Sequence, residues 1–202
     1  MTENVVQRRS VAVLIFPGVE LLDFAGPFEV FSAARTSTNS DERLMDVFTV
    51  AESHEPIRCN NPVTVTPDYA LAECPQAAVL VVPGGQGTRT AVDRAALIEW
   101  IRARARDAEL TTSVCTGSFL LAKAGLLVAK PVTTHWASVE RMRRDYPELD
   151  VQADVRWVDA GDVISSAGVS AGIDMALYVL ARLYGKGAAD VTARWIQYDH
   201  WR

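Results

Sequence analysis

The strongest pattern in the chain is a pair of apolar runs without polar alternation, at residues 11–16 and 78–82, and residues 110–114 are predicted as a further strand. Such runs are typical of parallel strands buried on both faces. Shorter apolar segments at 46–51 and 63–66 indicate two further strands. Segments 151–158 and 163–166 flank an Asp-Ala-Gly-Asp turn, and we expect them to pair with each other.

Between these segments, apolar positions recur with the helical period of 3.6 residues. The predicted helices cover residues 20–34, 94–106, 118–124, 137–146, 170–184 and 188–198. Ser170 is a candidate N-cap. Strands alternating with helices predict an α/β sandwich around a mainly parallel sheet. We expect residues 1–10 to be a short flexible lead and residues 11–202 to form a single domain.

Composition narrows the class of protein. Hydrophobic residues make up 49% of the 202 positions, which supports a full core and argues against disorder. The formal net charge is -5, and no long basic block occurs. The arginine-rich segments 102–106 and 141–144 are interpreted as solvated helix faces. We therefore expect no nucleic-acid partner.

Other classes are disfavoured by what the sequence lacks. No apolar run approaches the roughly 20 residues of a membrane span, and residues 1–10 lack a signal-peptide core. Three scattered cysteines do not make a disulfide framework, so we expect a cytoplasmic protein with reduced thiols. The three histidines have no metal-ligand spacing, and the Gly-rich turn after residue 82 lacks a P-loop ending. We expect no metal and no cofactor.

Cys115 is the leading candidate for chemistry. It follows the predicted strand 110–114 and is itself followed by Thr116, Gly117 and a helical pattern. This order is typical of a nucleophile elbow, a tight strand-to-helix turn that presents a reactive side chain. A helix N-terminus behind the sulfur would favour the thiolate and lower the thiol pKa. The alternative is a buried structural cysteine.

The ends of the predicted strands bring further candidates to the same place. Ligands of open α/β sheets bind beyond the carboxyl ends of the strands. The first strong strand leads to Glu20 and Asp23, the second to Gly84 and Gly85, and the third to Cys115. We expect these residues to meet in one crevice, and that convergence favours a functional role for Cys115.

A family resemblance rests on several motifs in a fixed order, at residues 16–27, 82–85, 113–118, 133–136 and 170–174. With these motifs the chain resembles the ThiJ/PfpI superfamily over nearly its whole length. The resemblance implies a flavodoxin-like three-layer sandwich and a homodimer. Proposed proteases of the superfamily carry His after the nucleophilic Cys. Thr116 stands there in this chain, which argues against a Cys-His peptidase.

Within the superfamily, the motifs most resemble those of isocyanide hydratases, and similar patterns occur in domains of AraC-type regulators. Those regulators carry a C-terminal helix-turn-helix pair, and none is expected before Arg202. By this resemblance Asp23 is the acid that contacts Cys115. Physically, a carboxyl beside a thiolate is a like-charge pair, so one member should keep its proton and the Asp pKa should rise. The alternative is an Asp favoured by the helix dipole.

The other candidates have two interpretations each. The N–H groups of Gly84, Gly85 and Thr116 could stabilise negative charge, or the glycines could form an ordinary turn. The hydroxyl of Thr116 could bind substrate or cap the following helix. His135 is expected in the pocket wall rather than as a base, and Trp136 in the pocket or the core. Glu20 is expected to be a solvated helix-start carboxylate, and Cys59 and Cys74 to be structural.

The function that the resemblance implies is cysteine-dependent hydration of an isocyanide to an N-substituted formamide, through a thioimidate on Cys115. The substrate is a small molecule. Two alternatives stay open. One is a non-enzymatic sensor of small molecules or oxidants, since exposed low-pKa cysteines are what oxidants attack. The other is a glyoxalase-like enzyme. The aromatic tail at 195–201 could pack on the domain or lie in a dimer contact.

Overall fold

The computed structural model describes residues 8–39 and 41–201, and its centre is a seven-stranded sheet with the order β10-β11-β7-β6-β1-β2-β5. Every neighbouring pair in it is parallel except β10–β11. The strands are β1 Arg9–Leu14, β2 Met45–Ala51, β5 Tyr69–Ala70, β6 Val79–Val82, β7 Leu110–Val114, β10 Trp157–Asp159 and β11 Val163–Ser166. Every residue of β6 and β7 is buried, which the continuous apolar pattern of β6 predicts, while β7 buries the polar side chains of Thr111, Thr112 and Ser113 as well.

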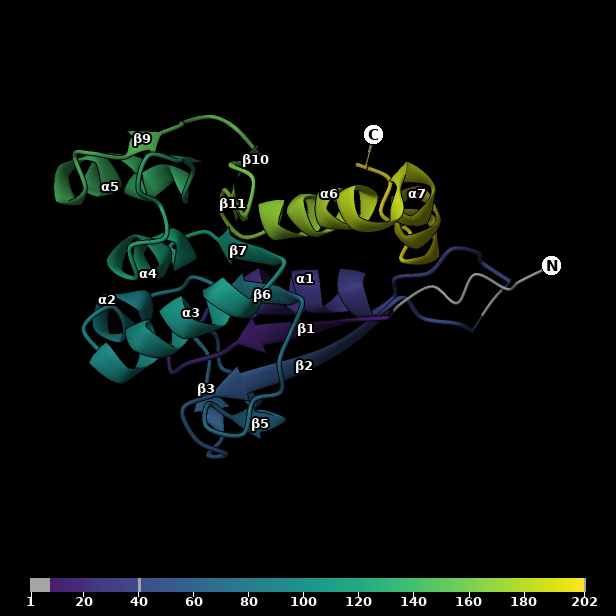
Figure 1. Ribbon diagram of the computed structural model, residues 1–202, viewed down its shortest axis with the longest axis horizontal. Coiled ribbons are helices and arrows are strands. Elements are labelled where there is room, and N and C mark those ends of the chain that lie inside the picture. The colour runs from purple at the N-terminus through teal and green to yellow at the C-terminus, as the bar shows by residue number, and fades with distance from the viewer. Residues whose placement is uncertain (1–7, 40, 202) are drawn as a thin grey trace.

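Helices cover the sheet in two groups that Figure 1 shows well apart. One group consists of α1 Leu21–Ser32, α6 Ala171–Tyr184 and α7 Lys186–Trp195, in which α6 packs against both α1 and α7. The helix α4 Gly117–Lys123 packs against α3 Ala95–Asp107 and α2 Thr88–Ala91. The predicted α/β architecture, a flavodoxin-like sandwich with a mainly parallel sheet, is confirmed.

Several predicted boundaries are corrected by the structure. The segment predicted as one strand at 151–158 contains two, β9 Asp150–Val151 and β10, and only β10 pairs with β11. Residues 63–66 contribute only β4 Thr64–Val65, which pairs with β3 Ile57–Arg58 outside the main sheet, and β9 pairs with β8 Pro131–Val132. The predicted helix at 137–146 is a short 3₁₀ turn, Trp136–Ser138, followed by α5 Val139–Asp145.

The two ends of the chain also refine the predictions. Strand β1 begins inside the segment expected to be a flexible lead, and residues 1–7 lie outside the described residues. Ser170 occupies the predicted N-cap position of α6, but its backbone angles are helical and its side chain makes no capping bond. The aromatic tail packs on its own chain: Tyr198 donates to Asp174 (2.9 Å) and Trp201 donates to Asp190 (2.8 Å).

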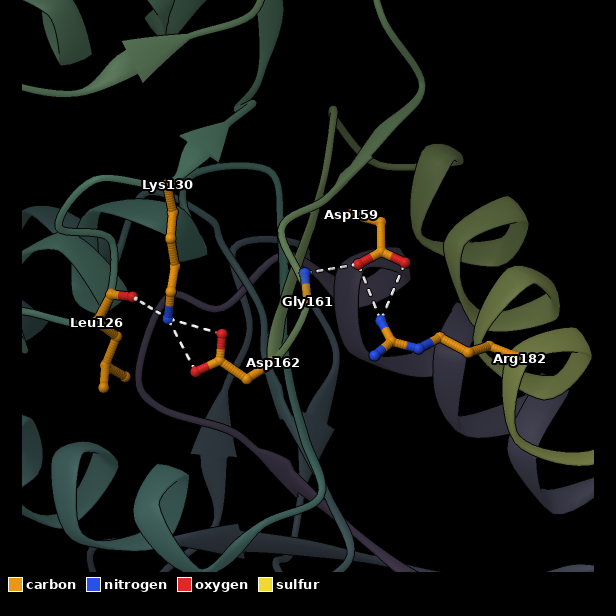
Figure 2. A network of polar contacts seen from close by, with 6 residues as sticks. All are labelled: Leu126, Lys130, Asp159, Gly161, Asp162 and Arg182. Carbon is orange, nitrogen blue, oxygen red and sulfur yellow. Dashed lines mark hydrogen bonds and ion pairs between the residues drawn. The ribbon is translucent and has the colours of Figure 1, made fainter.

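The β10–β11 hairpin at the edge of the sheet is held by charges from both sides (Figure 2). Asp159 accepts hydrogen bonds from the Gly161 N–H (2.8 Å) and from Arg182 of α6 (2.8 Å). On the other side, Lys130 donates to Asp162 (2.9 Å) and to the carbonyl of Leu126 (3.2 Å). The pKa values of both aspartates are lowered, that of Asp162 chiefly by its bond to Lys130 and that of Asp159 by Tyr178, Gly161 and Arg182 against the effect of burial.

Within the described part of the chain, no helix has both the length and the apolar character that crossing a membrane requires. The same residues contain no cluster of three or more His, Cys, Asp or Glu side chains arranged to hold a metal ion.

Candidate active site

Cys115 occupies the turn between β7 and α4 with a φ of +57°, in the left-handed region that residues other than Gly rarely adopt. Its N–H donates to the carbonyls of Ser166 and Ala167, both at 3.2 Å. Its own carbonyl accepts the hydroxyl of Thr134 (2.9 Å) and that of Ser118 (3.1 Å). These bonds hold a strained backbone in place, which is how a nucleophile elbow aims a side chain away from the strand.

Asp23 lies opposite the elbow, in the first turn of α1, and is fully buried. Its Oδ2 accepts the N–H of Gly84 at 3.0 Å. Its Oδ1 is buried and accepts no well-aligned hydrogen bond from any of the described residues. An ionised carboxylate with one oxygen unsatisfied is costly, so this setting favours the protonated acid, which can donate from Oδ1.

The pKa of Asp23 is raised to about 7, first by burial and secondarily by the charge of Glu20. The hydrogen bonds from Gly84 and Cys115 oppose this rise. The expected elevation of the Asp pKa is therefore confirmed. Its main cause is loss of hydration rather than the like-charge repulsion from which the sequence argument started.

The expected low pKa of the thiol is wrong. Burial, followed by the charge of Asp23, raises the pKa of Cys115 to about 12. The backbone N–H and hydroxyl of Thr116 favour the thiolate and do not outweigh burial. The sulfur belongs to a residue that is only 6% exposed. Burial removes the hydration that would stabilise a thiolate, and this loss outweighs the effect of the helix N-terminus.

The two groups titrate as a unit, because both are buried and in direct contact. Between the two apparent pKa values the pair holds one proton and one negative charge. When the proton lies on Asp23, the sulfur is a thiolate nucleophile beside a carboxylic acid. Above pH 7 these pKa values place the proton mainly on the sulfur, so the pair reaches its reactive form, a thiolate beside a carboxylic acid, when that proton moves from Cys115 to Asp23.

Gly84 and Gly85 allow the backbone to approach this pair closely. A Cβ on residue 84 would lie 2.5 Å from the Thr116 nitrogen and 2.8 Å from Asp23 Oδ2. The N–H of Gly85 donates to the Thr116 hydroxyl at 3.0 Å, and Thr88 donates to the same hydroxyl at 3.1 Å. Both glycine N–H groups are thus already engaged, and their contribution here is to position Asp23 and Thr116. Thr116 makes no side-chain capping bond to α4.

A cleft of about 250 Å³ opens over the sulfur and includes Cys115, Thr116, Gly85 and His135 in its wall. The Nδ1 of His135 accepts the N–H of Ala137 at 3.2 Å, and the ring packs against Gly168. No hydrogen bond joins His135 to Cys115 among the described residues, which agrees with a place in the wall. Trp136 is 78% exposed and belongs to neither the core nor the cleft.

Glu20 also faces the cleft, where its Oε2 accepts the side-chain N–H of Asn60 at 3.0 Å. The interpretation as a simple solvated carboxylate is therefore incomplete. Cys59 and Cys74 are buried away from the cleft, and desolvation raises both of their pKa values, consistent with structural roles.

Sequence reasoning missed two arginines of the cleft, Arg89 of α2 and Arg141 of α5. Arg141 was predicted to lie on a solvated helix face together with Arg143 and Arg144. Its guanidinium instead stacks on the Phe119 ring, 3.9 Å from the ring centroid. The only available signal was positional, since α5 follows the Thr-Thr-His-Trp motif that leads into the cleft wall.

Comparison with known proteins agrees with the family resemblance of the sequence motifs. The model of the DJ-1/PfpI family matches residues 9–182. An isonitrile hydratase of Pseudomonas putida (isonitrile is another word for isocyanide) is 31% identical over 93% of this chain and 78% of its own length. The transcriptional regulator CdhR of Pseudomonas aeruginosa is 30% identical over 85% of this chain, which spans only about half of that regulator.

Solved structures agree with the fold. A ThiJ/PfpI family protein of Pseudomonas syringae superposes with a TM-score of 0.85 at 28% identity, covering 96% of this chain and 76% of the other. DJ-1beta of Drosophila melanogaster shares the fold, with a TM-score of 0.82 at 23% identity over 95% of this chain and 98% of its own. With its elbow cysteine and its sheet order, this chain belongs to the DJ-1/PfpI family.

Proposed function

We propose that this protein is a cysteine-dependent hydratase that converts an isocyanide into an N-substituted formamide. The observation that carries the proposal is the contact between Cys115, on a strained elbow, and Asp23, a buried carboxyl with a pKa of about 7. This pair supplies a nucleophile and a proton to the same substrate atom. The similarity to an isonitrile hydratase supports the choice of substrate group.

The first step forms a bond between Sγ of Cys115 and the terminal carbon of R–N≡C. Asp23 transfers its proton to that carbon, which gives the thioimidate R–N=CH–S and leaves Asp23 ionised. No electron leaves or enters the system, so no oxidant or reductant is needed. Covalent catalysis of this kind divides one difficult hydration into two easier reactions.

The second step adds water to the thioimidate carbon. The Asp23 carboxylate accepts a proton from the water and passes it to the nitrogen, which gives R–NH–CH(OH)–S. The hydroxyl proton then returns to Asp23 while the carbon–sulfur bond breaks and the carbonyl forms. The products are R–NH–CHO, the Cys115 thiolate and protonated Asp23, which is the starting state.

The test is hydration of cyclohexyl isocyanide, followed by ultraviolet absorbance and by mass spectrometry of the formamide. The matched pair of variants is Cys115→Ala and Cys59→Ala. We expect loss of turnover by at least 10³-fold in the first and retention of activity in the second. Turnover that survives in Cys115→Ala, or that is absent from the intact reduced protein, would overturn the proposal.

The structure gives less support to an oxidant sensor. A sensor cysteine needs an exposed thiolate of low pKa, and Cys115 is buried with a raised pKa. Regulators and a glyoxalase of Caenorhabditis elegans also occur among the relatives, so methylglyoxal is the appropriate comparison substrate. Faster conversion of methylglyoxal than of any isocyanide would replace the hydratase by a glyoxalase-like enzyme.

We also propose that the protein is a homodimer, in keeping with the superfamily resemblance. Two large aromatic side chains are available for such a contact, since Trp136 is 78% and Trp195 is 47% exposed. Light scattering on a size-exclusion column is expected to give twice the mass of one chain. A single-chain mass at micromolar concentration would contradict the dimer.

A further inference from the structure

The cleft over Cys115 has charges of opposite sign at different depths. Its buried end holds the Cys115–Asp23 pair, which carries one negative charge above about pH 7. Arg89 is exposed and Arg141 is half-buried, and both also line the cleft. They come from α2 and α5, two helices far apart in the sequence. An apolar substrate would have no use for two guanidinium groups in the wall of so small a cleft.

Neither arginine has an acidic partner among the described residues. On the same helix as Arg141, Arg143 pairs with Glu140 and Arg144 pairs with Asp145. Arg89 and Arg141 form no ion pair, and the Nε of Arg141 is buried with no hydrogen-bond acceptor. The Nε itself is covered, so a ligand in the cleft would meet the terminal N–H groups of Arg141, which also have no hydrogen-bond acceptor among the described residues.

The orientation of Arg141 is fixed independently of any ion pair. Its guanidinium lies over the Phe119 ring, with 3.9 Å between the guanidinium carbon and the ring centroid. Stacking of this kind holds the planar group in one orientation with its N–H edge free. Desolvation and the nearby positive charge of Arg89 lower the pKa of Arg141, while the charge of Asp145, which is paired with Arg144, opposes this, so the two guanidinium groups of the cleft still repel each other. An anion between them would remove that repulsion.

The one carboxylate of the cleft wall that could neutralise the arginines is bound elsewhere. Glu20 accepts a hydrogen bond from Asn60, and no ion pair joins it to Arg89 or Arg141 among the described residues. The wall therefore presents two unpaired guanidinium groups, one of them rigid. Planar forks of this type match the two oxygens of a carboxylate better than an isolated ammonium does.

We propose that the substrate of this site carries a carboxylate, held by Arg89 and Arg141 while its other end reacts at Cys115. The inference rests on the proposed function for the identity of the reacting group, an isocyanide, and adds the class of substrate. A cleft of about 250 Å³ suits a small molecule with the two groups a few bonds apart, such as an isocyano acid.

The deciding test does not need turnover. The rate of Cys115 alkylation is measured at pH 8 with the anion iodoacetate and with the neutral iodoacetamide, and mass spectrometry locates the label. The ratio of the iodoacetate rate to the iodoacetamide rate is then compared with the same ratio for glutathione. Two guanidinium groups near the sulfur should raise the ratio at Cys115 at least tenfold over that of glutathione. A ratio equal to or below that of glutathione overturns the proposal.

Variants then assign the effect to the two arginines. Arg89→Gln and Arg141→Gln are each expected to lower the ratio several-fold, and Arg141→Lys to lower it less, because Lys keeps the charge and loses the fork. Arg106→Gln is the matched control, since Arg106 is exposed on α3 outside the cleft. A ratio that stays high in both Gln variants, or falls equally in Arg106→Gln, overturns the assignment. Circular dichroism checks that each variant is folded.

Turnover provides the second readout. The value of kcat/KM is measured for isocyanoacetate and for its methyl ester, and the acid is expected to be preferred at least tenfold, mainly through KM. If neither isocyanide is hydrated, the proposed function fails, and the alkylation ratio still decides whether the cleft selects anions. If the ester is preferred, the substrate class proposed here is wrong even where the hydratase is right.

Discussion

Asp23 and Asp159 are the same side chain in opposite settings. Asp23 is fully buried with no cation beside it, and its pKa rises to about 7. Asp159 lies at the edge of the sheet, where it binds Arg182 and Gly161 (Figure 2) and also accepts the Tyr178 hydroxyl, and its pKa is lowered. The first environment makes a carboxyl useful as an acid, while the second makes it a structural anion. The comparison shows that hydration and partners, rather than residue type, distinguish the two roles.

The largest difference between substitutions of Asp23 and of Asp159 is expected in the turnover of isocyanide. Asp23→Asn keeps the size of the side chain and an acceptor for the Gly84 N–H, and removes the acid. General acid–base catalysis is worth about 10²–10⁴-fold, so isocyanide hydration should fall by at least 10²-fold. Asp159→Asn should stay within twofold of the native protein. Steady-state assays of both variants test this. Equal losses would show that Asp23 acts through stability alone.

A second comparison uses two glycines, one beside each aspartate. Gly84→Ala places a methyl group 2.7 Å from the Thr116 hydroxyl and 2.8 Å from Asp23, so we expect activity to fall at least tenfold. Gly161 has a φ of +95°, and a Cβ there meets nothing within 4 Å. Gly161→Ala should therefore cost about 1 kcal/mol of backbone strain and leave activity unchanged. Kinetics together with urea unfolding separate the two effects.

The pH dependence of stability should have opposite signs at the two sites. Because the pKa of Asp23 is raised, its protonated form contributes stability that is full below the unfolded pKa near 4 and is lost as pH rises through 7. The pKa of Asp159 is lowered, so its contribution is present at neutral pH and is lost as pH falls below about 4.

Unfolding free energies from pH 3 to 9 test this sign difference. Asp23→Asn should raise stability at pH 8 by about 1 kcal/mol or more. Asp159→Asn should lower it by about 1 kcal/mol at most, since both Asp159 and Arg182 reach solvent. If the unfolding free energy depended on pH in the same way in both variants, the predicted difference in sign between the two sites would be wrong.

Much of this arrangement could be predicted from the sequence, for identifiable reasons. The apolar run at β6 has no alternation, an elbow pattern follows β7, and the carboxyl ends of parallel strands converge, so the meeting of Asp23, Gly84 and Cys115 follows from pattern and topology. The short helix Thr88–Ala91 has no apolar repeat to reveal it. The thiol pKa was mispredicted because burial of the sulfur depends on contacts between distant segments.

Charge patterns were the least reliable guide. Arg141, Arg143 and Arg144 form one basic run, and only the first turns into the cleft, because Phe119 from α4 offers it a ring on which to stack. That contact joins residues of two helices and leaves no trace in local sequence. The same holds for Glu20, whose position depends on Asn60.

The central claim is that Asp23, beside Cys115, is a buried acid whose pKa is raised to about 7. Infrared difference spectra between the native protein and Asp23→Asn, recorded from pH 4 to 9, measure it directly. The account predicts a protonated-carboxyl band that belongs to Asp23 and disappears with an apparent pKa near 7. A band that is lost near pH 4, or the absence of any such band, would contradict the account.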